Sequence, residues 1–289
     1  MTEQGTVLCA TDLGMSGATA LAWASAFARS LQLRLKLLHV DGAEFDTPAV
    51  PDKIRAAAMA LTGRLEERRK AHEAALAENA KSLDLHCELV VTTGRPWEET
   101  LRVAEAEKAS LIVVGPHDSG LGSTARRIIT HAKIPVLAAR GVAPRDLSGC
   151  NWVIGVPFEE DVPALVQNID RFASKHGGSC TLVRAVTPAG AAALSAPLAP
   201  AAPLTGLEEF VSATEAHLDT IAARLECPAR VHVAHGDPED VIDEAASEGD
   251  ILAVAAHERG ALERFFLGSV TERLLRKTAY AVYVEPAAD

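Results

Sequence analysis

The sequence has few aromatic residues and no long apolar run, and both absences narrow what the chain can be. Aromatic side chains make up 4% of the 289 residues, so any core must be built mainly from aliphatic side chains. Apolar runs such as 111–114 and 251–256 are far shorter than the ~20 residues that cross a bilayer. Residues 1–5 place no basic segment ahead of an apolar stretch, so we expect neither a membrane span nor a secretory signal.

Basic residues and cysteines are also in short supply. The chain has 28 Lys and Arg against 39 Asp and Glu, a net charge of −11, and such a surface repels nucleic-acid phosphates and anionic headgroups. We therefore expect no nucleic-acid partner and no membrane partner. The five cysteines are scattered without a CxxC pair, which argues against a disulfide framework or a zinc knuckle. Cys9 and Cys180 lie in strand-like runs and are predicted to be buried thiols of a cytoplasmic protein.

Several catalytic motifs are missing as well. No GxGxxG follows the first apolar run, and neither GxxxxGK[ST] nor GxSxG occurs, which excludes the dehydrogenase, P-loop ATPase and α/β-hydrolase templates. No acid and base pair stands out, so we assign no catalytic residue. His39, His117, His131 and His257 fall near predicted strand ends, but surface or capping roles are favoured over a composite zinc site, and we assign no metal.

An internal repeat is the first positive feature. Residues 90–98 read VVTTGRPWE and residues 231–239 read VHVAHGDPE, and each segment precedes a helical run and then a short apolar run. The glycine allows a positive φ after a strand, and the proline suits the first position of a helix, whose N–H has no intrahelical partner. In the second copy Asp237 takes the N-cap position, where its carboxylate is expected to accept N–H groups.

Both halves alternate strands and helices in the same order. The predicted strands are 6–11, 34–40, 85–92, 111–115 and 135–139, then 151–156, 180–186, 229–234, 251–256 and 281–285. This alternation predicts right-handed crossovers and a parallel sheet covered on both faces. We therefore predict an α/β fold of two tandem Rossmann-like domains, 1–145 and 146–289, each a five-stranded, mostly parallel sheet flanked by helices.

Four segments between these strands are predicted in more detail. Apolar spacing indicates a helix over 16–31, and a long charged helix is expected over 55–82. The proline- and alanine-rich stretch 187–206 corresponds to 41–51 of the first copy and is expected to form a mobile surface loop over the carboxyl edge of the sheet.

The run Gly268–Arg276 followed by Ala281–Val284 resembles the signature of the universal stress protein family. Nucleotide-binding members of that family carry two spaced glycines and then Gly with Ser or Thr, between the fourth strand and the fourth helix. Glycines let the backbone approach phosphate oxygens, and a helix N-terminus supplies N–H donors and a positive dipole end. An Asp after the first strand and the Gly-x-Pro turn also fall in family order, so the resemblance covers essentially the whole chain.

In the first copy the resemblance implies an adenine-nucleotide pocket, formed by Ala10, Thr11, Asp12, Val40, Gly115, Gly122, Ser123 and Thr124. The family uses the Asp12 position toward adenine. Asp118 replaces the second glycine, and the segment from Gly115 to Gly122 is six residues shorter than its counterpart, which favours adenosine or a monophosphate over a triphosphate. The alternatives are that Asp12 caps the following turn and that Ser123 is a plain helix N-cap.

The second copy departs further from the family pattern. Glu258 and Ala255 stand at the two earlier glycine positions, and Pro157 stands at the Asp position. An acidic side chain repels a polyphosphate, and proline accepts no side-chain hydrogen bond from a base. We therefore interpret this copy as a degenerate pocket, with Ser269 as a plain N-cap, at the four residues Gly268, Ser269, Val270 and Thr271.

The resemblance implies a non-catalytic stress-response regulator with ATP or another adenine nucleotide as the candidate ligand and an unidentified protein partner. One alternative is a nucleotide-free interaction module with two degenerate pockets, and a weaker one is slow ATP hydrolysis. The resemblance also implies that the fifth strands, 135–139 and 281–285, pair antiparallel as an intramolecular pseudo-dimer, leaving other surfaces for a further homodimer.

Overall fold

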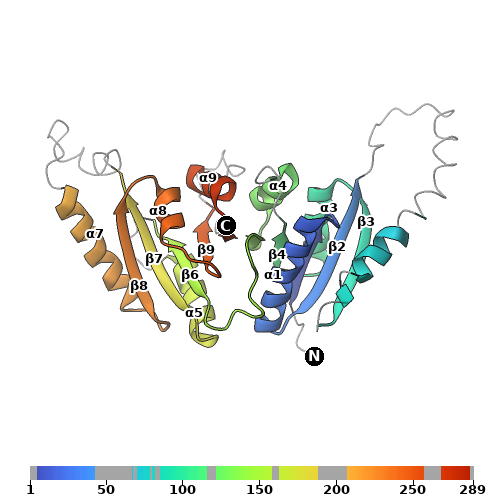
Figure 1. Ribbon diagram of the computed structural model, residues 1–289, viewed down its shortest axis with the longest axis horizontal. Coiled ribbons are helices and arrows are strands. Elements are labelled where there is room, and N and C mark those ends of the chain that lie inside the picture. Colours follow the sequence, from blue (N-terminus) through green and yellow to red (C-terminus); the bar gives the residue numbers. More distant parts are fainter. Residues whose placement is uncertain are drawn as a thin grey trace. The chain divides into compact units, whose positions relative to one another are not determined.

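Each half of the computed structural model contains five strands in one repeated order (Figure 1). The structure describes residues 5–42, 67, 70–78, 80–81, 85–115, 122–157, 163–187, 207–256 and 268–286. The chain divides into two compact units, the first made of Met1–Ala139 with Ala143–Asp146 and the second of Arg140–Val142 with Leu147–Asp289.

In the first unit the sheet order is β3-β2-β1-β4-β5. Its strands are β1 (Thr6–Thr11), β2 (Arg34–Gly42), β3 (Cys87–Gly94), β4 (Ala109–Val114) and β5 (Val136–Ala138). All four neighbouring pairs are parallel. Its helices include α1 (Met15–Leu31), α3 (Pro96–Ala106) and α4 (Ser123–His131).

The second unit repeats this order as β8-β7-β6-β9-β10, again with parallel neighbours. Its strands are β6 (Asn151–Gly155), β7 (Ser179–Val186), β8 (Ala229–His235), β9 (Ile251–Ala255) and β10 (Ala281–Glu285). Its helices are α5 (Ala164–Lys175), α7 (Leu207–Ala222), α8 (Pro238–Glu244) and α9 (Ser269–Lys277). The predicted α/β fold with two parallel sheets is confirmed.

The cores are aliphatic, as the small number of aromatic residues predicts. Val7, Leu8 and Cys9 of β1 are fully buried, because a central strand of a parallel sheet is covered on both faces. Helix α1 turns its small side chains, Ala20 and Ala24 among them, toward the sheet. Small residues let the helix approach the strands closely.

The order in which the chain adds strands to each sheet creates a switch point at the carboxyl ends of the strands. From β1 the chain passes outward to β2 and β3, and it then returns across the sheet to β4 and β5. Because the crossovers are right-handed, α1 lies on one face of the sheet, and α3 and α4 lie on the other (Figure 1). Open α/β sheets bind ligands at such a switch point, beside the carboxyl ends of the strands. In the first unit this point lies between β1 and β4.

Some local predictions differ from the structure. Strand β2 continues through Asp41 and Gly42, which pair with Thr93 and Gly94, so the predicted loop 41–51 begins two residues too early. Asp237 is the N-cap of α8, but its side chain makes no capping hydrogen bond, contrary to expectation. The predicted helix 55–82 is helical at 67, 70–78 and 80–81.

Other predictions fall outside what the structure describes. These are the remainder of the predicted helix 55–82, residues 43–51, and all but the first residue of the predicted loop 187–206. The antiparallel pairing of the two fifth strands stays a prediction, since the relative positions of the chain's parts are not determined. Among the described residues, no helix combines the length and the apolar character needed to cross a membrane.

Candidate functional site

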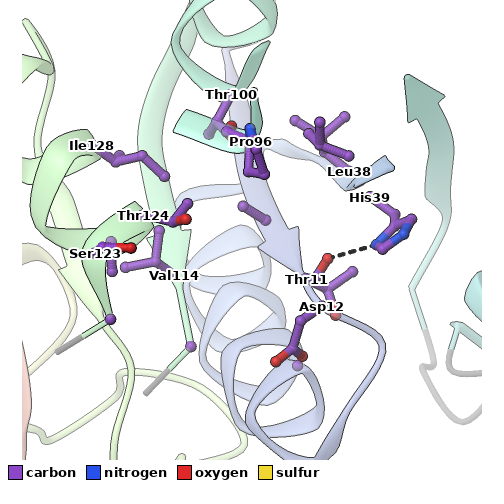
Figure 2. A pocket seen from close by; sticks show the side chains of 16 residues that line it. Thr11, Asp12, Leu38, His39, Pro96, Thr100, Val114, Ser123, Thr124 and Ile128 are labelled. Carbon is purple, nitrogen blue, oxygen red and sulfur yellow. Dashed lines mark hydrogen bonds between the residues drawn. The ribbon is translucent and has the colours of Figure 1, made fainter. Parts of the chain in front are cut away.

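A cavity of about 330 Å³ opens at the switch point of the first unit, a volume typical of small-molecule sites (Figure 2). Its lining comprises Ala10, Thr11, Asp12, Gly17, Leu38, His39, Val40, Pro96, Thr100, Val114, Gly115, Gly122, Ser123, Thr124, Ala125 and Ile128. All eight residues predicted for the first copy belong to this lining. Residues separated by more than a hundred positions therefore meet at one place.

The end of β1 presents two polar side chains to the cavity. Thr11 Oγ1 accepts the N–H of Leu13 at 3.0 Å, and Asp12 Oδ1 accepts the N–H of Gly14 at 2.9 Å. The turn role proposed as an alternative for Asp12 is therefore present. The same residue is exposed and lines the cavity, so the turn fixes the carboxylate at the cavity mouth without burying it.

Helix α1 approaches this turn closely because residue 17 is glycine. A Cβ at Gly17 would lie 2.1 Å from Thr11 Oγ1 and 3.3 Å from Asp12 Oδ1. Any larger residue would have to displace the threonine hydroxyl that receives the Leu13 N–H. The glycine thus maintains the geometry of both polar side chains.

His39 also lines the cavity, although no specific role there was predicted for it from the sequence. Its Nδ1 lies 2.9 Å from the carbonyl oxygen of Thr11, and the side chain is 9% exposed (Figure 2). Because a carbonyl only accepts, Nδ1 carries a proton in this contact. The ring also packs edge-on against His72, with centroids 4.4 Å apart. The signal available in the sequence was its place on β2, one residue before Val40.

The N-terminus of α4 faces the cavity from the side opposite Asp12 (Figure 2). Gly122 is the N-cap and has no side chain to cap with, so Ser123 is the first helical residue and not the N-cap. The first N–H to bond inside the helix belongs to Arg126, which reaches Gly122 O at 3.0 Å. The N–H groups of the three preceding residues precede the helical ladder, and this is the arrangement that binds anions.

An apolar wall completes the cavity and was not predicted. It consists of Leu38, Pro96, Val114 and Ile128, which come from four different elements. Thr100 also lines the cavity, but it donates its hydroxyl to Pro96 O at 2.7 Å and so presents mainly its methyl group. Flat apolar walls of this kind suit one face of a heterocyclic ring.

Charge is sparse in the cavity. Among the described lining residues, Asp12 has the single carboxylate, and neither lysine nor arginine is present. Among the described lining residues a triphosphate would therefore meet neither lysine nor arginine, whereas one phosphate group can be held by the helix N-terminus alone. The lining favours a ligand of low negative charge.

The second unit carries different residues at the same positions. In the first unit Thr11 pairs with His39, and in the second unit Gly155 pairs with Val183. The next residues along, Val156 and Arg184, are therefore the equivalents of Thr11 and His39. Arg184 is 3% exposed, and its guanidinium donates from Nε to Val156 O at 3.0 Å and from a second nitrogen to Pro157 O. A long cationic side chain thus crosses the strand end where the first unit has Thr11 and Asp12.

The start of α9 has the same backbone as that of α4. Gly268 is the N-cap, so the predicted capping role of Ser269 is wrong, and the N–H of Glu272 makes the first helical bond to Gly268 O at 2.9 Å. Thr271 is buried. Val270 lies within the first turn, while Glu258 falls outside the described residues.

Three carboxylates of the second unit lie close together, but their neighbours argue against a metal ion. Oxygens of Asp237, Glu239 and Asp240 lie within 4.8 Å of one another. Arg273 Nη1 lies 3.1 Å from Glu239 Oε1, and Lys277 Nζ lies 3.2 Å from Asp240 Oδ1. Two cationic side chains already pair with two of these three carboxylates, so we assign no metal to the cluster.

Comparisons with known proteins agree with this architecture. Residues 5–140 and 153–285 each match the model described as the universal stress protein family. None of the curated proteins matches the chain. Among solved structures, a universal stress protein from Archaeoglobus fulgidus is 15% identical, with 98% of each chain covered and a TM-score of 0.62. A Pseudomonas aeruginosa structure described as a putative universal stress protein is 14% identical, with 98% of this chain and 93% of that chain covered and a TM-score of 0.60.

Proposed function

Both halves of the chain belong to the universal stress protein family, and from this premise we propose that the protein is a stress-response regulator whose first unit binds an adenine nucleotide. The supporting observation is the cavity that joins Asp12 to the N-terminus of α4. One end offers a carboxylate that accepts N–H groups, as adenine requires, and the other offers N–H donors that suit a phosphate. Apolar side chains line the space between them.

We propose adenosine monophosphate as the preferred ligand. A single phosphate can receive the backbone N–H groups and the hydroxyls of Ser123 and Thr124, while the described lining has no lysine or arginine to offset further charge. The two further phosphates of ATP would add negative charge that no cationic side chain of the described lining offsets. The ligand order we expect is therefore AMP first, ADP second and ATP last.

For the second unit we propose a role without nucleotide, in contact with a protein partner. Val156 and Pro157 replace the polar pair Thr11 and Asp12 that the first unit presents, and the guanidinium of Arg184 occupies the strand end. The expected stoichiometry is consequently one nucleotide per chain.

Isothermal titration of the full chain with AMP, ADP and ATP tests the site directly. We expect one AMP per chain, an affinity in the micromolar to millimolar range typical of such pockets, and weaker binding of ATP. If the chain does not bind AMP at millimolar concentration, the nucleotide proposal is wrong, and the nucleotide-free interaction module remains as the alternative. Tighter binding of ATP would contradict the charge argument but not the site.

The Ser123→Ala variant tests the phosphate end of the cavity independently of the adenine end. We expect this variant to bind AMP roughly tenfold more weakly, because it loses one hydroxyl donor to a charged phosphate, and to bind adenosine as before. Thr220→Ala, an exposed hydroxyl on α7 in the other unit, is the matched control. Equal losses for AMP and adenosine would show that Ser123 does not lie at the phosphate.

We propose that the site binds without catalysis. Hydrolysis needs a water positioned by a base beside the terminal phosphate, and the described lining places its carboxylate and its histidine at the end away from the α4 N-terminus (Figure 2). Phosphate release from ATP should equal that of buffer, and release that disappears in Ser123→Ala would overturn this part of the proposal.

A further inference from the structure

Two cysteines of the second unit lie side by side although the sequence places them far apart. The Cys227 thiol donates a hydrogen bond to Cys180 Sγ at 3.2 Å, and neither cysteine forms a disulfide. A disulfide has an S–S length of about 2.05 Å, so the two sulfur atoms are about 1 Å from bonding distance. Cys9, Cys87 and Cys150 form no disulfide either.

The backbone around the pair already holds both residues in place. Cys180 is the second residue of β7, and its N–H donates to Pro228 O at 2.9 Å, next to Cys227. Asp170 of α5 accepts the N–H of Cys227 at 2.9 Å and the N–H of Glu226 at 2.9 Å. A bond between the sulfur atoms would therefore need a side-chain movement and no rearrangement of strands.

The exposed fraction and the pKa of each thiol decide how fast the two cysteines react with an oxidant. Cys180 is 0% exposed and Cys227 is 4% exposed, at the turn that leads from α7 into β8. Burial raises the pKa of both thiols above their ordinary value, and the nearby Asp170 carboxylate adds to this. Since the thiolate is the reactive form, burial and the raised pKa values slow the oxidation of both thiols, and we expect them to react only during sustained exposure to oxidants.

We propose that Cys180 and Cys227 form a dithiol that peroxide oxidises slowly to a disulfide. The Cys227 thiolate attacks one oxygen of hydrogen peroxide and breaks the O–O bond, giving a sulfenic acid and, after proton transfer, water. The Cys180 sulfur then attacks the Cys227 sulfur, loses its proton and displaces the hydroxyl group as a second water. Two thiols and one peroxide become one disulfide and two waters.

The disulfide would stiffen one edge of the second sheet. β8 is the outer strand next to β7, and the new bond would fasten the turn before β8 to the start of β7. It would also close a chain segment from residue 180 to residue 227, which lowers the entropy of the unfolded chain. An oxidant signal would thus be converted into a more rigid surface, in the unit for which we propose a protein partner.

Peptide mapping after peroxide treatment tests the bond. Trypsin releases Cys180 in the peptide 176–184 and Cys227 in the peptide 225–230, so the disulfide joins these two peptides with a mass two hydrogen atoms below their sum. We expect the five thiols of the unfolded, untreated chain to fall to three after treatment, and to return to five with dithiothreitol. Oxidation of Cys227 to a sulfinic acid, or no loss of thiols, would overturn the proposal.

Variants in which one cysteine at a time is replaced by serine test for other disulfide pairings. Cys87→Ser removes a half-buried thiol of the first unit and should leave the linked peptides unchanged, whereas Cys227→Ser should abolish them. Thermal unfolding supplies a second readout. We expect peroxide to raise the melting temperature of the second unit by roughly 5 °C or more in the Cys87→Ser protein and to leave Cys227→Ser unshifted. An equal shift in Cys227→Ser would show that the disulfide is not its cause.

Discussion

Asp12→Ala is expected to weaken the binding of AMP and of adenosine equally, by roughly 10- to 100-fold. The carboxylate lines the cavity at the end away from α4, where we place the adenine, and a hydrogen bond to a charged acceptor contributes about 1.5–3 kcal/mol. Equal losses for both ligands follow because neither the sugar nor the phosphate contacts this end. Isothermal titration with the two ligands measures the effect.

A conservative variant separates ligand contact from turn formation. Asp12 Oδ1 also accepts the Gly14 N–H, so alanine removes a turn contact together with the ligand contact. Asp12→Asn keeps a side-chain oxygen for Gly14 and removes the charge. If adenine is recognised by the carboxylate, Asn should lose most of the affinity while melting as the unmodified protein does. Unchanged affinity in both variants would show that Asp12 does not contact the nucleotide.

Much of the fold was predictable because its signals are local. Alternating strand and helix patterns, the Gly-x-Pro turn and the repeated order together specify parallel sheets, and Gly94 and Gly236 both adopt φ of 151° where the turn was expected. Strand ends were less predictable. β2 reaches Gly42 because its pairing with β3 continues, and a sequence pattern contains no information on the length of its partner.

The site was predictable at its backbone positions and not at its walls. Residues of the family motif, such as Asp12 and Ser123, were named because glycine and hydroxyl patterns mark them. Leu38 and Ile128 were missed because an apolar residue in a strand or a helix looks the same whether it faces a core or a cavity. The contact between Cys180 and Cys227 was missed for a related reason, since nothing local links residues of β7 to the turn before β8.

The two units illustrate how one fold gains or loses a ligand site. At one pair of equivalent positions His39 is replaced by Arg184, and at another Asp12 is replaced by Pro157. Both arrangements satisfy the carbonyl at the strand end, by Nδ1 of the histidine or by Nε of the arginine. The strand end is therefore stabilised in either case, and only the chemistry offered to a ligand differs.

Asp170→Ala is expected to destabilise the second unit by about 3 kcal/mol. The Asp170 side chain is 8% exposed and accepts the backbone N–H groups of Glu226 and Cys227. Alanine would leave these donors without their acceptor, in a turn where the N–H of Cys227 is buried, and each such loss costs about 1–3 kcal/mol. The melting temperature of this unit should fall by roughly 6–12 °C.

Two comparisons make the Asp170 result specific. Asp170→Asn keeps a neutral acceptor oxygen and should lose about half as much stability, because hydrogen bonds to a charged acceptor are roughly twice as strong. AMP binding belongs to the first unit and should be unchanged in both variants at temperatures where the second unit stays folded. Differential scanning calorimetry with AMP titration provides both readouts. If Asp170→Ala melts within 2 °C of the unmodified protein, other groups or water must accept the N–H groups of this turn. The proposed role of Asp170 in holding Cys227 in place would then lose its main support.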